Sequence, residues 1–579
     1  MTCPTLPTIA MMVLSASRMT QGFLVKSGRL SSSSLPVTRR FAVTVEPKSS
    51  ASPDLYQCQA GFTEDEKEAV FSFERRLKDS GIDAEGLEHA LFWPQGDTAP
   101  SRGLKTNLNI PLGKVLIKLP RSQAICLDEG ESTPFPQWVP QKQWKKMPWY
   151  AQLGLKLVYE RKTSTSALKA GYTQLLPPPE GIPTPLHWPE EDLNALRGVY
   201  PVLAGKVDRQ RQLWAGLYDA LGKTRAVRED MDETTFVWAM ESVLSRAFKG
   251  TFGTGFNSLA PSLLLVALFA GIYYLDQETI QLLSYALEEY PYLAVIPGAL
   301  VLLPSLLEFF RSKATYVLAP MIDSLNHRST VPTDLDYDSV RQRFRLSLGE
   351  DFKAGQQVFM SYGDKSNDDL LFHYGFVEVD AAADVFEFGD LLDWLLENRA
   401  GIVNDDRVQT LFSKGLQENV RSCRLGRRGR LVDEKALEGL RILLASDDEL
   451  RAENAITESI IQTPMFLTLD EFQDSVFSKE LQSPTELAVY EAMLEATLEQ
   501  RQRLSLTQEE EEELGKAAAS RERLGAETEI AERAPRLLTL AFRVEKLRLL
   551  DEAIARFRKL TGAEKQLLLP PKSAASKSV

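Results

Sequence analysis

Hydrophobic positions change their spacing along the chain, and each spacing predicts one kind of element. Residues 64–78 set apolar side chains among charged ones, as expected of a helix with one buried face. Residues 234–248 repeat apolar side chains every three or four positions and predict an amphipathic helix. Residues 344–348 alternate like a strand, and residues 357–362 predict another. The first part of the chain is therefore predicted to mix helices and strands.

The pattern is almost entirely helical from about residue 385 to about residue 560. One helix start is well marked, because Thr507 with Glu510 three positions later forms a capping box. Between residues 103 and 120, a Pro/Gly turn separates two short predicted strands. We therefore expect a leader over 1–45, an α+β domain over 46–385 and an all-helical domain over 386–579.

Two uncharged apolar runs, 250–275 and 290–307, interrupt the α+β domain and define an insertion over 250–312. A bilayer-spanning helix needs about 20 mostly apolar residues, so both runs are candidates for a membrane hairpin. Basic residues flank the pair on both sides, which would place both ends on the same side of the membrane. The alternative is a pair of buried or interfacial helices, and three prolines in the second run favour it.

Composition and charge narrow the class of protein. The 579 residues are 44% hydrophobic and 25% charged, as in ordinary globular proteins, and their formal net charge is −13. This acidic balance disfavours nucleic acid as a partner. The four Cys residues lie far apart without a Cys-x-x-Cys pair, which argues against a disulfide framework and a structural zinc site. We therefore expect no metal.

The first 45 residues have the composition of a targeting segment. They carry five Lys or Arg residues, a Ser run over 31–34 and no acidic residue before Glu46. A basic, Ser-rich segment without acids is typical of an organelle transit peptide, and the alternative is a disordered tail. We expect a chloroplast location, with the mitochondrion as the second choice.

Two clusters of residues could carry chemistry. The first, Asp323-Ser-Leu-Asn326-His327, ends an apolar stretch, and the second runs from Ser361-Tyr362-Gly363 to Tyr374-Gly375-Phe376. Taken alone, each cluster is explained by a structural role, since a single His is more often a hydrogen-bonded structural group than a catalyst. One His with one carboxylate also makes an incomplete ligand set for a metal.

Together, the clusters and two earlier motifs occur in an order that resembles the SET-domain methyltransferases. The motifs are Arg102-Gly103-Leu104, Ser245-Arg246-Ala247-Phe248, Asp323-x-x-Asn326-His327 and Ser361-Tyr362-Gly363…Tyr374-Gly375-Phe376. More narrowly, the order is similar to the branch that contains the plastid Rubisco large-subunit lysine methyltransferase and the actin-histidine methyltransferase. The segments 483–488 and 542–546 resemble the helical substrate-binding domain of that branch.

The resemblance implies a fold, an activity and a site. The fold would be an α+β SET domain, with short β-sheets, a pseudoknot and inserted helices, followed by an all-helical domain. In the pseudoknot, the segment of Asn326 and His327 would thread beside the strand that leads to Tyr362. The activity would be S-adenosylmethionine-dependent N-methylation of a target lysine in a folded plastid protein. Tyr362 would be the catalytic residue. The cofactor would be bound by Ser101, Arg102, Gly103, Asn326, His327, Tyr374 and Phe376, and the substrate by Arg246 and Asp323. The resemblance places Gly103 in a Gly-rich turn whose backbone approaches the cofactor.

Two other functions stay open. The insertion and the Arg-rich stretch 421–430 would also suit a non-catalytic SET-like subunit of a plastid nucleoid or transcription complex. A histidine target is the second alternative, and the plastid-like leader favours lysine over it.

Overall fold

The computed structural model describes residues 64–92, 101–164, 166–222, 230–252, 314–445, 484–521 and 534–562. The expected leader lies outside these ranges. So do the apolar run 290–307 and all but the first three residues of the run 250–275. Within the described ranges, no helix combines the length and the apolar character needed to cross a membrane.

Short sheets build the first part of the chain. The sheet that matters most has the strand order β1-β2-β10-β7. Its strands are β1 (Leu87–Phe92), β2 (Ser101–Thr106), β10 (Gln357–Met360) and β7 (Asn326–His327). Two three-stranded sheets lie beside it, β3 (Val115–Pro120), β9 (Arg343–Leu348) and β8 (Thr333–Asp338), and β4 (Ile125–Asp128), β6 (Thr315–Leu318) and β5 (Phe248–Gly250). The strands predicted around the Pro/Gly turn and over 344–348 are confirmed, and the strand predicted over 357–362 ends two residues earlier.

The pairing of β7 with β10 is parallel, whereas β10 pairs with β2 in the antiparallel sense. Phe359 and Met360 of β10 lie opposite Asn326 and His327 of β7. The two segments that carry the Asn-His and Tyr motifs are therefore side by side, although more than 30 residues separate them in sequence. This confirms the expectation that the Asn-His segment threads beside the strand leading to Tyr362.

Helices cover these sheets and continue into the second part of the chain. In the first part they are α2 (Glu64–Ser80), α3 (Gln141–Trp144), α4 (Trp149–Thr163), α5 (Ala167–Leu175), α6 (Glu190–Val199), α7 (Pro201–Leu221) and α9 (Glu233–Arg246), with short 3₁₀ turns η1 (Arg121–Gln123), η2 (Pro179–Gly181), η3 (Pro185–His187) and η5 (Ile322–Ser324). The helix predicted over 234–248 ends at Arg246. Phe248 instead starts β5, because its backbone pairs with Val317 of β6.

The second part is mainly helical, as predicted. It follows α13 (Asn367–Tyr374), the last helix of the first part. Its own helices are α14 (Leu391–Asn398), α15 (Asp405–Ser413), α16 (Gln417–Arg421), α17 (Glu434–Leu444), α19 (Pro484–Leu504), α20 (Gln508–Arg521) and α22 (Ala534–Thr561), with a 3₁₀ turn η6 (Arg427–Gly429). The structure adds a small sheet of β11 (Val385–Glu387), β12 (Arg424–Gly426) and β13 (Arg430–Leu431). Strands of two or three residues are too short to show the alternation by which strands are recognised.

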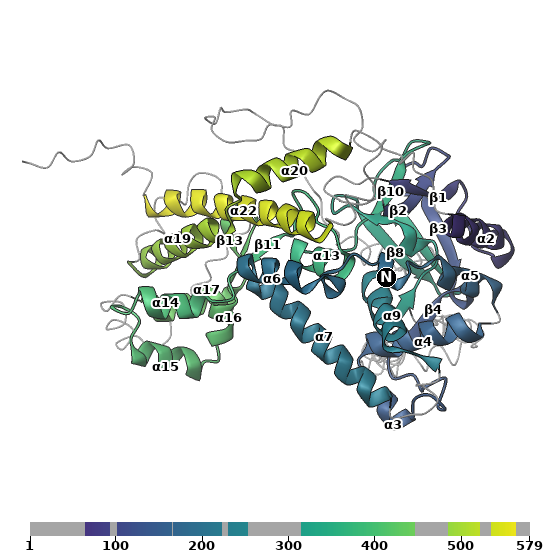
Figure 1. Cartoon of the computed structure of the whole chain (residues 1–579), viewed down its shortest axis with the longest axis horizontal. Coiled ribbons are helices and arrows are strands. Elements are labelled where there is room, and N and C mark those ends of the chain that lie inside the picture. Colours follow the sequence, from purple (N-terminus) through teal and green to yellow (C-terminus); the bar gives the residue numbers. More distant parts are fainter. Residues whose placement is uncertain are drawn as a thin grey trace, which may run out of the picture. The chain divides into compact units, whose positions relative to one another are not determined.

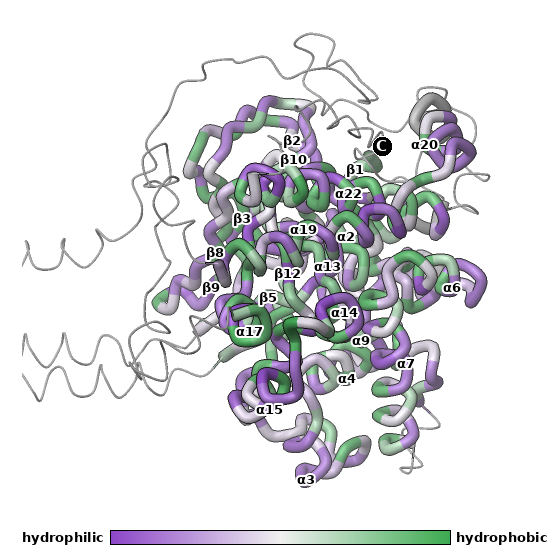
Figure 2. Tube along the Cα trace, turned by 90° about the vertical axis from the view of Figure 1, so that its left-hand side faces the viewer, coloured by the Kyte–Doolittle hydropathy of each residue, from purple (hydrophilic) through white to green (hydrophobic). Residues whose placement is uncertain are grey.

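Side-chain caps mark several helix starts, among them those of α20 and α13. The Thr507 Oγ accepts the Glu510 N–H at 3.2 Å, and the Glu510 carboxylate accepts the Thr507 N–H at 2.8 Å. This reciprocal pair confirms the predicted capping box of α20, a helix on which Figure 2 shows mostly hydrophilic residues. Ser366 caps α13 by accepting the Asp369 N–H at 3.3 Å. The cap fixes where α13 begins, just after Tyr362 and Gly363.

The described residues form two hydrophobic cores, and α7 contributes to both. Its first half packs Leu203, Ala204 and Val207 against the C-terminal helices. Its second half packs Trp214 and Leu221 in the core of the sheets. Figure 1 shows α7 running from the group of C-terminal helices to α4 and α9. A helix that belongs by sequence to the α+β part thus also supports the helical part.

Candidate active site

Tyr362 lies two residues beyond β10, and the neighbouring segment accepts hydrogen bonds from its backbone N–H and from its phenol. Its backbone N–H donates to Nδ1 of His327 at 2.9 Å, and its phenol donates to the Leu325 carbonyl at 2.8 Å. Both partners belong to the segment of β7 that runs parallel to β10. A phenol whose proton is committed to a carbonyl still has lone pairs with which to accept a hydrogen bond from another group.

Aromatic rings surround this phenol. The Tyr374 ring stacks on Tyr362 with a centroid distance of 4.9 Å and an interplanar angle of 28°. The Phe376 ring lies 6.1 Å from both Tyr374 and His327. Burial raises the pKa of Tyr362, and it raises the pKa of Tyr374 to about 12. Both phenols are therefore neutral at physiological pH, and the cluster presents hydrogen-bonding groups without charge.

Asn326 lies at the edge of the cluster, against the backbone of Gly103. A Cβ atom added to Gly103 would stand 2.7 Å from Nδ2 of Asn326 and 2.7 Å from Nε2 of Gln357. Only glycine therefore lets β2 approach the Asn326 amide this closely. The expectation that Gly103 belongs to a turn is wrong, since it lies within β2, paired with Ala90 of β1.

Ser101 and Arg102 occupy the start of the same strand, where they pair with Phe92 and Leu91. The Arg102 guanidinium donates to the Leu175 carbonyl at the end of α5. Arg102 also lies close enough to Asp323 to lower the pKa of that carboxyl group. The structure thus places the side chain of Arg102 beside the expected substrate residues.

Asp323 and Arg246 meet in the interior. The Arg246 guanidinium donates to the Asp323 carbonyl at 2.9 Å and lies 4.0 Å from its carboxylate oxygen Oδ2. The Tyr172 hydroxyl, from α5, donates to the same oxygen. Oδ1 has no hydrogen-bond partner among the described residues, and burial raises the pKa of Asp323 to about 6. Asp323 thus retains a buried hydrogen-bond acceptor that no described residue uses.

The structure therefore brings the expected site residues together around the β7–β10 pairing, and it adds two that the sequence did not reveal. Tyr172 lies about 150 residues from Asp323, and no motif contains it. Glu378 lies 3.4 Å from Nε2 of His327, and its place two residues after Phe376 was the only available signal. Long-range contacts of this kind are not encoded in local spacing.

The residues present fit S-adenosylmethionine as a ligand. The rings of Tyr374 and Phe376 suit an aromatic base, and the Asn326 amide, in a cradle that a Cβ at Gly103 would fill, suits a polar group. Within the described ranges, no three His, Cys, Asp or Glu side chains are grouped to hold a metal ion. A cavity of about 190 Å³ lies elsewhere, and its lining includes Tyr200 between α6 and α7, Phe386 of β11 and Arg503 of α19.

Comparisons with known proteins agree with this geometry. No family model matches the sequence. The chain is 35% identical over 95 residues to an actin-histidine N-methyltransferase of Drosophila melanogaster. This aligned region covers 16% of this chain and 18% of that protein. It is 38% identical over 66 residues to the ribosomal lysine N-methyltransferase set10 of Schizosaccharomyces pombe, which covers 11% of this chain and 12% of that protein. The chain thus matches less than a fifth of the length of these curated relatives.

The structural likeness is much more extensive. The crystal structure of the SET domain of LSMT bound to lysine and AdoHcy matches with a TM-score of 0.51 at 15% sequence identity. The match covers 88% of this chain and 97% of that chain, including the helical part that follows the sheets. From this match and the parallel pairing of β7 with β10, we conclude that the chain has the SET-domain fold.

Proposed function

We propose that this protein is an S-adenosylmethionine-dependent protein N-methyltransferase with a lysine side chain as its target. The observation that carries the proposal is the parallel pairing of β7 with β10, which sets Asn326 and His327 beside Tyr362. The likeness to a SET domain whose structure holds lysine and AdoHcy supports it. The two curated relatives, both N-methyltransferases, support it as well.

The site supplies alignment and proton control. S-adenosylmethionine would supply an electrophilic methyl group, whose bond to sulfur breaks as the bond to the target nitrogen forms. Tyr362 would accept a hydrogen bond from the target amine and direct the nitrogen lone pair, since its own proton is donated to Leu325. Alignment of this kind is worth roughly 7–11 kcal/mol in well-oriented reactions.

The target amine has to lose a proton before it can attack. A lysine side chain has an ordinary pKa near 10.4, so it is mostly protonated at neutral pH. The apolar rings of Tyr362, Tyr374 and Phe376 would lower the pKa of an amine held among them, because burial disfavours the charged form. The proton would leave to water before the amine attacks, and no residue has to keep it.

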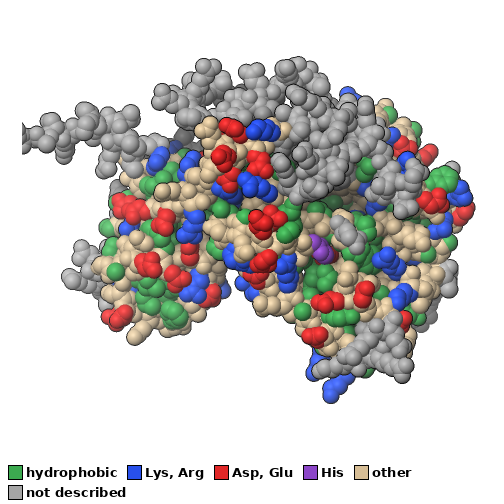
Figure 3. All heavy atoms as spheres, viewed as in Figure 1, with side chains coloured by type: hydrophobic (Ala, Val, Ile, Leu, Met, Phe, Trp, Pro, Cys, Tyr) green, Lys and Arg blue, Asp and Glu red, His purple; other side chains and the backbone are tan. Residues whose placement is uncertain are grey.

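Substrate contacts would come from the interior pair and from the helical part. Arg246 and Asp323 would bind polar groups of the substrate through the unpartnered oxygen Oδ1 of Asp323. A protein partner is favoured over nucleic acid, because Arg421 pairs with Glu418 at 3.2 Å and Arg427 with Glu552 at 3.2 Å. On the face shown in Figure 3, basic and acidic side chains of the described residues are intermixed.

The test compares the full-length protein with its Tyr362→Phe variant in a tritiated-methyl transfer assay on organelle extract. We expect labelling of a protein by the wild type and a loss of about 100-fold or more in the variant, since the lone pair of the target loses its partner. Tyr337→Phe removes a phenol of β8 outside the site and serves as the matched control. Equal labelling by wild type and Tyr362→Phe would remove Tyr362 from the mechanism.

Two further measurements separate the alternative functions. Acid hydrolysis followed by amino-acid analysis identifies methyllysine or methylhistidine, and the second result would favour the activity named for the Drosophila relative. A non-catalytic subunit would bind no S-adenosylmethionine in calorimetry at millimolar concentration. Binding of S-adenosylmethionine without methyl transfer to any protein would support the cofactor site and contradict the proposed enzymatic activity.

For the location of the protein, the proposal is a chloroplast, based on the basic, acid-free segment before Glu46. Imaging of the full chain with a C-terminal fluorescent tag in plant cells tests it, and mitochondrial signal would favour the second choice. Carbonate extraction of organelle membranes from these cells tests whether the runs 250–275 and 290–307 form a membrane hairpin. Complete release into the soluble fraction would contradict a spanning hairpin.

A further inference from the structure

The hydrogen bond between Tyr362 and His327 fixes the state of the His327 ring. Because Nδ1 accepts the Tyr362 N–H at 2.9 Å, it carries no proton, and the proton of the neutral ring is on Nε2. Nε2 lies 3.4 Å from Oε2 of Glu378. Neither of these two buried atoms makes a hydrogen bond to any described residue. The Nε2–H group and the carboxylate oxygen are therefore neighbours in a charge contact, and neither has another polar partner in the described part of the chain.

Glu378 is itself ionised and oriented. Its other carboxylate oxygen, Oε1, accepts the Ser329 N–H at 2.8 Å. Although burial opposes it, the nearby His327 ring and the hydrogen bond from the Ser329 N–H lower the pKa of Glu378. A carboxylate held at one oxygen by a backbone amide presents the other oxygen in a fixed direction.

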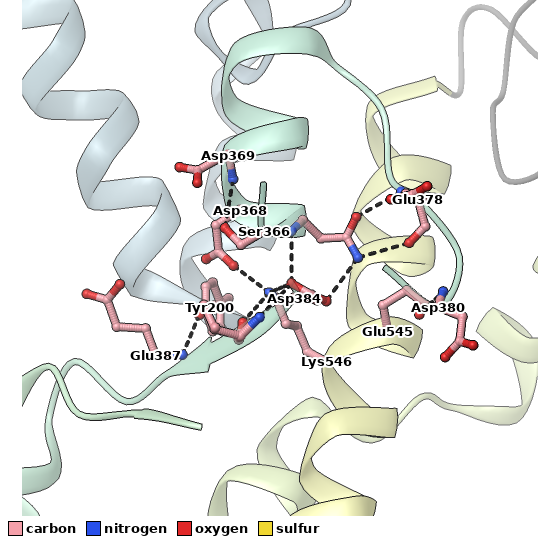
Figure 4. A network of polar contacts seen from close by, with 12 residues as sticks. Tyr200, Ser366, Asp368, Asp369, Glu378, Asp380, Asp384, Glu387, Glu545 and Lys546 are labelled. Carbon is pink, nitrogen blue, oxygen red and sulfur yellow. Dashed lines mark hydrogen bonds and ion pairs between the residues drawn. The ribbon is translucent and has the colours of Figure 1, made fainter. Parts of the chain in front are cut away.

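The backbone of Glu378 is clamped by a buried amide. The Glu378 N–H donates to Oδ1 of Asn367 at 2.8 Å, and Nδ2 of Asn367 donates to the Glu378 carbonyl at 3.0 Å. Nδ2 of Asn367 also donates to Asp384 at 2.9 Å, and Lys546 of α22 donates to Asp384 at 2.8 Å. Figure 4 shows this network from the C-terminal helix to Glu378. The position of Glu378 is thus fixed from several elements.

We propose that Glu378 is a positioning residue for the reaction proposed above, and that its carboxylate keeps the proton of His327 on Nε2 so that Nδ1 can accept the Tyr362 N–H. A proton on Nδ1 would set two donors against each other at 2.9 Å and push Tyr362 away. Displacement of a reacting group by about 1 Å can lower a rate about 100-fold. Glu378 would act through His327, which lies 3.4 Å away, and needs no contact of its own with cofactor or substrate.

The test uses the full-length protein labelled with ¹⁵N-histidine, whose four His residues give few enough ring signals to resolve. The His327 signals are assigned by comparison with His327→Gln. The variants are Glu378→Leu, which removes the acceptor, and Glu378→Gln, which keeps a carbonyl oxygen. Glu350→Gln is the matched control, because Glu350 pairs with the neighbouring Arg328 at 2.8 Å on the surface.

In the wild type we expect the Nε2–H tautomer of His327. In Glu378→Leu we expect a mixture of tautomers and a kcat lower by about tenfold to 100-fold, with a much smaller change in KM. Glu378→Gln should restore most of the kcat and the wild-type tautomer, and Glu350→Gln should change neither.

Two results would overturn the proposal. One is an Nδ1–H tautomer in the wild type, which needs no variant to be observed. The other is a folded Glu378→Leu variant with wild-type tautomer and kcat. The tautomer measurement does not depend on activity, so it tests the role of Glu378 even if the wild type methylates no protein. That absence of methylation would contradict the proposed function alone.

Discussion

At the scale of single residues, Asp323 is notable because its carboxyl group is buried and only partly satisfied. Tyr172 and Arg246 contact Oδ2 and the backbone carbonyl, whereas Oδ1 has no partner in the described part of the chain. Burial raises its pKa from 3.8 to about 6, and Arg246 and Tyr172 oppose that rise. Between about pH 4 and pH 6, the folded protein therefore holds a proton here that the unfolded chain has lost.

This difference predicts a pH-dependent stability that Asp323→Asn removes. Because the folded-state pKa is the higher one, the favourable contribution of this group is fully present below about pH 4 and is lost as the pH rises to about 6. The free energy of unfolding of the wild type, minus that of the variant, should fall by about 3 kcal/mol over this range. Urea unfolding at pH 4, 5, 6 and 7 measures it.

Tyr172→Phe provides a second check of the same group. The Tyr172 hydroxyl lowers the pKa of Asp323, so its removal should move the pH step upward. Parallel stability profiles for the wild type and Asp323→Asn would show that this carboxyl group does not titrate between pH 4 and 6.

Gly103→Ala tests the cradle beside Asn326. The new Cβ would stand 2.7 Å from Nδ2 of Asn326, so the amide has to move. We expect S-adenosylmethionine binding to weaken about tenfold, or about 1.4 kcal/mol, in calorimetry. Gly198→Ala in α6, where nothing lies within 4 Å of the added Cβ, should leave binding unchanged. Unchanged S-adenosylmethionine binding by Gly103→Ala would contradict a contact between Asn326 and the cofactor.

The sequence predicted most of this residue-scale picture, but by motif rather than by geometry. The order of motifs led to Tyr362, Asn326 and His327, which the structure brings together. Tyr172 could not be found, because its partner Asp323 is distant in sequence and no local pattern joins them. Gly103 was expected in a turn, since an isolated glycine gives no sign that its neighbour across the strands is a side-chain amide.

At the scale of elements, the sequence predicted a helix or strand where the hydrophobic pattern was long enough to show its period. The helix over α2 and the strand β9 were predicted from spacing, and the capping box marked the start of α20. The two-residue strand β7 has no pattern of its own and exists because β10 pairs with it. The element on which the site depends most is therefore one that periodicity cannot reveal.

Thr507→Ala tests the capping box of α20. The variant loses the acceptor for the Glu510 N–H, and loss of such a cap costs about 1 kcal/mol. Glu510 also binds Arg543 of α22 at 2.7 Å, so α20 should stay docked while its first turn frays. Hydrogen exchange should become faster at the first amides of α20 and stay unchanged in α22.

Gln508→Ala is the control for this prediction, because among the described residues the Gln508 side chain bonds the exposed Glu512, at 3.4 Å. Exchange at the start of α20 that is as slow in Thr507→Ala as in this control would contradict a stabilising cap.

At the scale of the whole molecule, the two hydrophobic cores share elements that the sequence assigned to separate domains. The first half of α7 packs with the C-terminal helices, and Lys546 of α22 reaches back to Asp368 of α13. Neither contact could be predicted, because helical spacing tells which face is buried but not against which partner. The β11–β13 sheet, also missed, provides Val385, whose carbonyl accepts from Lys546 at 2.5 Å.

Lys546→Met tests this buried cluster. The lysine is fully buried, and its ammonium contacts Asp368 and Asp384, so the variant leaves two buried carboxylates without a cation. Removing one partner of a buried ion cluster typically costs about 3–5 kcal/mol. Urea unfolding followed by tryptophan fluorescence measures the loss. Lys206→Met, which breaks the half-exposed pair with Glu387 at 3.2 Å, should cost at most about 1 kcal/mol.

The pH dependence and a triple variant separate charge from packing in this cluster. Burial already raises the pKa of Asp368 in the wild type, and loss of the ammonium removes the group that opposes that rise. The folded Lys546→Met variant should therefore bind protons more tightly than its unfolded chain, and it should regain stability as the pH falls. Adding Asp368→Asn and Asp384→Asn should restore much of the loss at pH 7. If the triple variant is no more stable than Lys546→Met at pH 7, the cost comes from lost packing, and charge is not what holds α22 to α13.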